Sequence, residues 1–104
     1  MLNGIITRGT TANLVFPLNT IDKIVSYSIS YKQKKHTVIT QRKTEDVFNT
    51  IKTTLTTDET LLFNPAVDVV QIQIKGLNQN GFTSVIGNYR YRLVDVFDES
   101  DLEG

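Results

Sequence analysis

The chain has 104 residues, of which 39% are hydrophobic and 21% are charged, a composition typical of one globular domain rather than a disordered segment. It contains no cysteine, which excludes disulfides, thiolate metal sites and cysteine nucleophiles. Acids and bases are equal in number at 11 each, but five of the acids lie in the last ten residues, where there is no base.

The first predicted element is an interrupted strand that runs from Ile5 to Phe16, with a turn at Arg8-Gly9-Thr10. Pro17 follows it, and because proline cannot donate to a β ladder we expect it at a sheet edge or a strand end. The segment before the strand lacks the apolar run and the cleavage site of a signal peptide, and no stretch approaches the length of a membrane span. We therefore expect a soluble, unprocessed protein that makes no membrane contact.

The clearest pattern lies between Val25 and Tyr31, where large apolar residues alternate with serines. A strand places successive side chains on opposite faces, so this segment predicts a strand with one buried face. A polar turn at residues 32–35 and a returning strand from His36 to Thr40 complete a predicted hairpin.

A third strand is predicted from Val47 to Leu55. Thr56, with Glu59 three residues later, matches a capping box, so one short helical turn is expected near residues 57–62. Such a turn commonly crosses from one sheet of a sandwich to the other.

The remaining strands follow a proline at position 65. Alternating apolar and polar residues predict a strand at 67–75, and Asn80-Gly81 supplies the positive φ angles of a tight hairpin. A strand at 82–86, a break at Gly87-Asn88 and a last strand at 89–97 end the pattern.

Together these elements predict an all-β fold, an immunoglobulin-like β-sandwich of about seven antiparallel strands. Residues 1–97 form the single predicted domain, and residues 98–104 form an acidic C-terminal tail. The bases are most concentrated between Lys32 and Lys43, so two interpretations are open. Either the loop and the tail are simply solvated, or the tail of one copy docks on the basic loop of another.

The residues that carry chemistry do not form a catalytic set. His36 is the only histidine and lies among lysines, Asp58 and Glu59 fit a helix cap, and the tail acids lack the spacing of a calcium loop. We therefore expect no enzyme activity, no cofactor, no metal and no small-molecule ligand.

Residues 89–92 alternate tyrosine and arginine, as some nucleic-acid surfaces do. On a strand, however, the tyrosines and the arginines face opposite sides, and the acidic tail would repel phosphate. The pattern therefore argues against nucleic acid as the partner.

Two segments resemble small uncharacterised proteins of phages and prophages of Gram-positive bacteria. The first is Gly4-Ile5-Ile6-Thr7-Arg8-Gly9-Thr10-Thr11 with Phe16-Pro17-Leu18. The second is the run from Leu55 to Phe63, followed by Val70-Gln71-Ile72-Gln73-Ile74 and Asn80-Gly81. This resemblance implies a β domain of the virion with a structural or accessory role, assembled in the cytoplasm of the bacterial host, and it supplies no catalytic residues.

We therefore expect a non-catalytic assembly protein of the tail, neck, baseplate or capsid surface, whose partners are other virion proteins and copies of itself. The contact residues that we predict are Arg8, Thr10, Lys34, Lys35, Arg90, Arg92, Asp95, Asp98, Glu99, Asp101 and Glu103. The alternative is a host-surface or glycan-binding module that uses exposed aromatic faces, with Tyr27, Tyr31, Phe82 and Tyr89 as the candidates.

Overall fold

The computed structural model describes residues 2–95, so the predicted tail at 98–104 and the predicted strand end at residue 97 lie outside the described part of the chain. The elements in chain order are β1 (Gly4–Thr7), β2 (Ala12–Pro17), β3 (Ile24–Gln33), β4 (His36–Lys43), β5 (Thr50–Leu55), α1 (Thr57–Thr60), β6 (Val69–Asn78) and β7 (Thr83–Val94).

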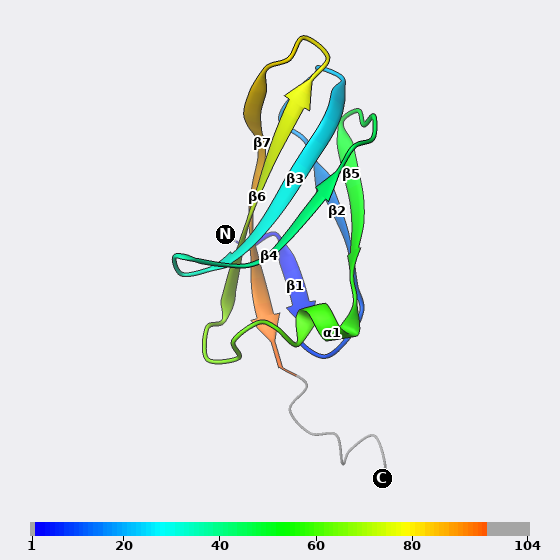
Figure 1. Ribbon diagram of the computed structural model, residues 1–104. Coiled ribbons are helices and arrows are strands. Elements are labelled where there is room, and N and C mark those ends of the chain that lie inside the picture. The colour runs from blue at the N-terminus through cyan, green and yellow to red at the C-terminus, as the bar shows by residue number, and fades with distance from the viewer. Residues whose placement is uncertain (1, 96–104) are drawn as a thin grey trace.

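The seven strands form two sheets, one with five strands in the order β1-β7-β6-β3-β4 and one with the pair β2-β5. The two sheets pack face to face, and α1 lies at one end of the sandwich, in the connection from the small sheet to the large one (Figure 1). The predicted all-β fold is confirmed. The order β7-β6-β3-β4 facing β2-β5 corresponds to the G-F-C-C′ and B-E strands of immunoglobulin-like sandwiches.

The prediction that all strands are antiparallel is wrong for one pair. β1 runs parallel to β7, with Gly4 opposite Tyr91 and Thr7 opposite Val94. The predicted interrupted strand is in fact two strands in different sheets, because the turn after Thr7 carries the chain from the large sheet to the small one. Gly9 has a φ of 84°, a left-handed conformation that glycine adopts without steric cost, and this allows the turn.

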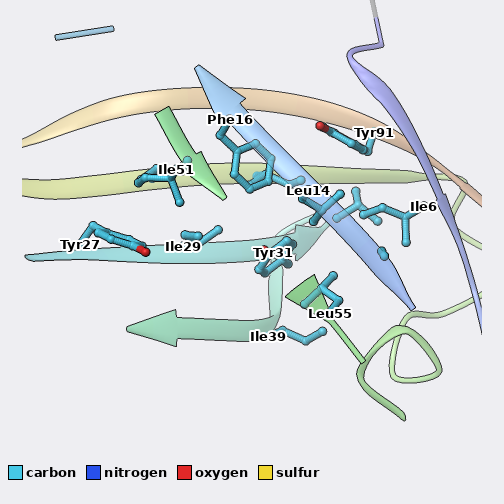
Figure 2. Close-up of a cluster of buried hydrophobic side chains, with 14 of the residues drawn as sticks. Ile6, Leu14, Phe16, Tyr27, Ile29, Tyr31, Ile39, Ile51, Leu55 and Tyr91 are labelled. Atoms are coloured by element: carbon cyan, nitrogen blue, oxygen red, sulfur yellow. The ribbon is translucent and has the colours of Figure 1, made fainter. Parts of the chain in front are cut away.

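The core lies between the inner faces of the two sheets. Alternate residues of β3, namely Tyr27, Ile29 and Tyr31, are buried, and Phe16 and Ile51 of the small sheet are fully buried opposite them. Figure 2 shows these side chains in the space between the ribbons of the two layers. Period-two alternation therefore places the core as predicted, because each strand has one face against the opposite sheet.

β7 continues through the predicted break at Gly87 because a β-bulge absorbs one extra residue. The register passes from Ile74 opposite Gly87 to Lys75 opposite Val85, so Ile86 has no partner of its own, and both Ile86 and Gly87 are buried. A side chain on the neighbouring Gly76 would meet the end of Ile86 at 2.5 Å, so glycine there leaves the room that Ile86 fills.

Other boundaries also differ from the predictions: β4 extends to Lys43 and β6 covers Val69–Asn78 instead of 67–75. β5 begins at Thr50 rather than at Val47, which forms only an isolated bridge to Ile24. The β3–β4 turn contains only Lys34 and Lys35, because Gln33 is the last residue of β3 and is buried. Pro17 ends β2, an edge strand, as expected.

Candidate functional site

Arg8, one of the predicted contact residues, holds three parts of the fold together at the α1 end of the sandwich. Its Nε donates to the Phe63 carbonyl at 2.8 Å and its Nη2 to the Leu61 carbonyl at 3.1 Å. Its Nη1 lies 3.3 Å from Oδ1 of Asp95. The guanidinium therefore joins the turn after β1, the segment after α1 and the end of β7.

Thr10, another predicted contact residue, belongs to the same arrangement. Its hydroxyl donates to the Thr7 carbonyl at 2.7 Å, and its carbonyl accepts from Oγ1 of the fully buried Thr60 at 2.8 Å. Arg8, Thr10 and Asp95 are thus brought together, and their described contacts lie within the molecule. Asp98, Glu99, Asp101 and Glu103 lie outside the described residues.

Lys34 and Lys35 form the tip of the β3–β4 hairpin, where both are exposed. Lys34 has a φ of 55°, in the left-handed region that favours glycine or asparagine. His36 beside them is also exposed. The hairpin tip is therefore a small cationic projection, separate from Arg8 and Thr10.

Arg90 and Arg92 point away from the core on the outer face of the large sheet. Arg90 stands opposite Gln71, which in turn stands opposite Lys32 on β3. Lys32, Gln71 and Arg90 therefore lie in one row across three strands, with the Gln71 amide group between the two cations. The tyrosines that alternate with these arginines lie on the inner face, as the strand pattern predicted.

We call this surface the basic sheet face; its members are the outward-facing Lys32 on β3, Arg42 on β4, Lys75 on β6, and Arg90 and Arg92 on β7. Between them lie serines, glutamines and asparagines. None of the strands in residues 2–95 contains an acidic residue, so these five cations have no carboxylate among them on the face. The potential over this face is therefore positive.

The basic sheet face is hollowed along the row of Arg90. A shallow depression of about 450 Å³ is lined by Asn3, Lys32, Gln71, Ile72, Gln73, Asn88, Tyr89 and Arg90. Its rim offers amide groups and two cations. Such a lining suits a carboxylate-bearing or otherwise polar chain better than an apolar ligand.

A second surface lies at the end of the sandwich opposite α1, where the β2–β3, β4–β5 and β6–β7 connections meet (Figure 1). We call it the loop end. Each connection there exposes one large apolar side chain: Ile21 is 95% exposed, Phe48 60% and Phe82 70%. Sequence reasoning missed this set because Phe48 and Phe82 lie at the starts of segments predicted to be strands, where large apolar residues are expected in the core.

Backbone hydrogen bonds hold the three connections of the loop end to one another. The Leu18 amide donates to the Asn49 carbonyl, and the Gln79 amide donates to the Lys23 carbonyl. Lys23 also pairs with Asp46 at 3.1 Å. The three apolar side chains therefore lie on connections that are bonded to one another, not on independent loops.

Two of the three tyrosines named for the glycan alternative are not available as stacking surfaces, and the third is half-buried. Tyr27 and Tyr31 are buried in the core, and Tyr89 stacks on Phe16 with ring centroids 5.2 Å apart. Burial raises the pKa of Tyr31 well above its usual range, and burial followed by the hydrogen bond to Glu45 does the same to the pKa of Tyr27. Of the four candidates, Phe82 is the most exposed, at 70%.

In residues 2–95 no three histidine, aspartate or glutamate side chains gather closely enough to hold a metal ion. The same residues contain no helix with the length and apolar character that a membrane crossing needs. No family model, no curated protein and no solved structure matches this chain.

Proposed function

We propose that this protein is a non-catalytic structural component of a phage particle, which acts through protein–protein contacts made by its loop end. The observation that carries the proposal is the exposure of Ile21, Phe48 and Phe82 on three braced connections. Burying one large apolar side chain contributes about 1.5–3 kcal/mol, so three of them at one end supply the centre of a stable interface.

The phage assignment is supported by the sequence resemblance of two segments at the α1 end of the small sheet, around Arg8-Gly9-Thr10 and around Thr56–Phe63. Hydrogen bonds join these two segments in the fold. Arg8 donates to the Phe63 carbonyl, and Thr60 donates to the Thr10 carbonyl. The resembling residues thus shape the scaffold, and the loop end presents the contact surface. The burial of Tyr27 and Tyr31 makes the glycan-binding alternative the less favoured one.

The experiment is to quantify the protein in purified phage particles by mass spectrometry. The wild type is compared with a variant that combines Ile21→Ser, Phe48→Ser and Phe82→Ser. We expect the wild type in many copies per particle. We expect the variant to remain folded but to fall at least about tenfold in copy number, because three apolar contacts are lost.

A matched control carries Val15→Ser and Leu62→Ser, which are 52% and 63% exposed and lie outside the loop end. It should enter particles as the wild type does. Absence of the wild type from particles would contradict the virion assignment, and equal incorporation of the loop-end variant would contradict the role of the loop end.

A further inference from the structure

We propose that the basic sheet face binds the acidic C-terminal segment of a second copy of this chain. This inference concerns the purified protein alone, so it can fail or hold whether or not the protein belongs to a phage particle. The face and the segment are complementary in charge and in spacing, and the chain leaves the sandwich near the edge of the face.

The charges of the chain are balanced overall but separated in space. Residues 2–95 carry 11 bases against 7 acids, a surplus of four positive charges, and residues 96–104 carry four acids and no base. All seven acids of the described part lie outside the strands, whereas five of the bases form the basic sheet face. The segment therefore supplies the countercharge that the face lacks.

The spacing of the acids suits an extended strand-like ligand. Glu99, Asp101 and Glu103 are two residues apart, so an extended chain places all three carboxylates on one side at intervals of about 6.8 Å. Arg90 and Arg92 have the same two-residue interval along β7, and Lys32 lies in the row of Arg90. Carboxylates and cations can thus meet in successive rows, with Gln71 and Asn88 to donate further hydrogen bonds.

The exit of the chain favours a second copy as the source of the segment. β7 runs toward the α1 end, and Asp95 is held there by Arg8, whose side chain also bonds to the carbonyls of Leu61 and Phe63. Asp95, the last described residue, therefore lies beyond the row of Arg92 at the end of the basic sheet face. A segment that follows Asp95 is placed to reach the face of a neighbouring copy without turning back along β7.

Nucleic acid fits this face less well. Tyr89 and Tyr91 pack on Phe16 at the inner face, so among residues 2–95 the side chains that alternate with Arg90 and Arg92 are turned toward the core rather than presented beside the cations for bases to stack on. The acidic segment in the same chain also competes with phosphate for the cations.

The test is a charge swap followed by sedimentation equilibrium at low salt. One variant reverses the face with Lys32→Glu and Arg90→Glu; the other reverses the segment with Asp98→Lys, Glu99→Lys, Asp101→Lys and Glu103→Lys. We expect the wild type to self-associate, and to do so less as salt is raised. Each variant alone should have a dissociation constant at least about tenfold higher, because like charges then meet.

An equimolar mixture of the two variants should associate again, because each then offers the other a complementary partner. A matched control, Lys34→Glu with Lys35→Glu, makes the same change of charge at the hairpin tip and should associate as the wild type does. Circular dichroism verifies that every variant keeps its β fold.

Four results would overturn the proposal. In the first two, the wild type or the mixture of variants stays monomeric at low salt. In the third, the hairpin-tip control loses association while the face variant keeps it. In the fourth, the wild type does not self-associate but binds duplex DNA, and the face variant has lost that DNA binding.

Discussion

Gln33 is one of three buried polar residues in residues 2–95, and its hydrogen bonds explain why it is there. It is 4% exposed, and its Nε2 donates to the carbonyls of Asn64 and Val67 at 3.0 Å each. Its Oε1 accepts from the Asn64 amide at 2.7 Å. One side chain thus satisfies three backbone groups in the connection from α1 to β6, which has no ladder to satisfy them.

We expect Gln33→Ala to lower the free energy of unfolding by about 2–3 kcal/mol, because it removes the side-chain partner of the Asn64 amide and of the Val67 carbonyl and removes buried contacts, whereas the Asn64 carbonyl keeps its bond from the Val67 amide. Urea unfolding followed by circular dichroism measures the change. The matched control is Gln71→Ala on the exposed face of β6, which should change stability by less than about 0.5 kcal/mol. Equal effects of the two substitutions would show that the Gln33 hydrogen bonds contribute nothing.

At the scale of elements, Arg8 closes the α1 end of the sandwich. The C-terminal turn of a helix leaves carbonyls without intrahelical partners, and α1 has no basic residue in its last turn. Arg8 supplies the donors from the turn after β1 and reaches Asp95 beyond β7 as well. The capping box of Thr56 and Glu59 closes the other end of α1, as the sequence predicted.

We expect Arg8→Ala to destabilise the fold by about 2 kcal/mol, since it removes two hydrogen bonds from a charged donor to backbone carbonyls. Arg8→Lys should recover less than half of the loss, because one ammonium group cannot reproduce the fork of the guanidinium. Asp95→Asn should cost less than about 1 kcal/mol, because the ion pair is partly exposed. Thermal unfolding of the three variants ranks them, and a larger loss for Asp95→Asn than for Arg8→Ala would refute this assignment.

At the scale of the whole molecule, all four tyrosines lie at the inner face of the large sheet, and their ionisation links stability to pH. Burial raises the pKa of each of them above the ordinary value. The folded state therefore holds the phenol protons more tightly than the unfolded chain does. Stability is fully present below the unfolded-state pKa of about 10 and falls as the pH rises above it.

We expect the free energy of unfolding to fall above about pH 10, by as much as ~1.4 kcal/mol per pH unit for each tyrosine that stays neutral in the folded state. Tyr31→Phe should flatten this slope, although at neutral pH it costs about 1 kcal/mol through the lost hydrogen bond to Gln41. Phe82→Tyr adds an exposed phenol and should leave the slope unchanged. Urea titrations at several pH values measure the slope, and an unaltered slope in Tyr31→Phe would refute the prediction.

The sequence predicted most strands because alternation is a local property. In β3 the apolar residues recur at every second position from Tyr27 to Tyr31, and any sheet must bury that side. The helical turn was equally readable, since Thr56 and Glu59 form their reciprocal hydrogen bonds within three residues. The boundaries that failed, at Gln33, at Val47 and at Gly87, depend on partners distant in sequence.

The candidate surfaces also combine features that local sequence predicted with features that depend on strand pairing. The outward direction of Arg90 and Arg92 followed from alternation alone. Their meeting with Lys32 depends on the pairing of β7 with β6 and of β6 with β3, which no local pattern encodes. The convergence of Ile21, Phe48 and Phe82 at one end depends likewise on how three separate connections stack.

The all-β class, the buried faces of the strands and the start of the helical turn could be read from local sequence, because these depend on residues within a few positions of one another. The parallel pairing of β1 with β7, the contacts of Arg8 at the α1 end and the shared face of five cations emerged only in the folded chain. Each of these requires strands far apart in the chain to lie side by side, and that arrangement is selected by the packing of the whole core.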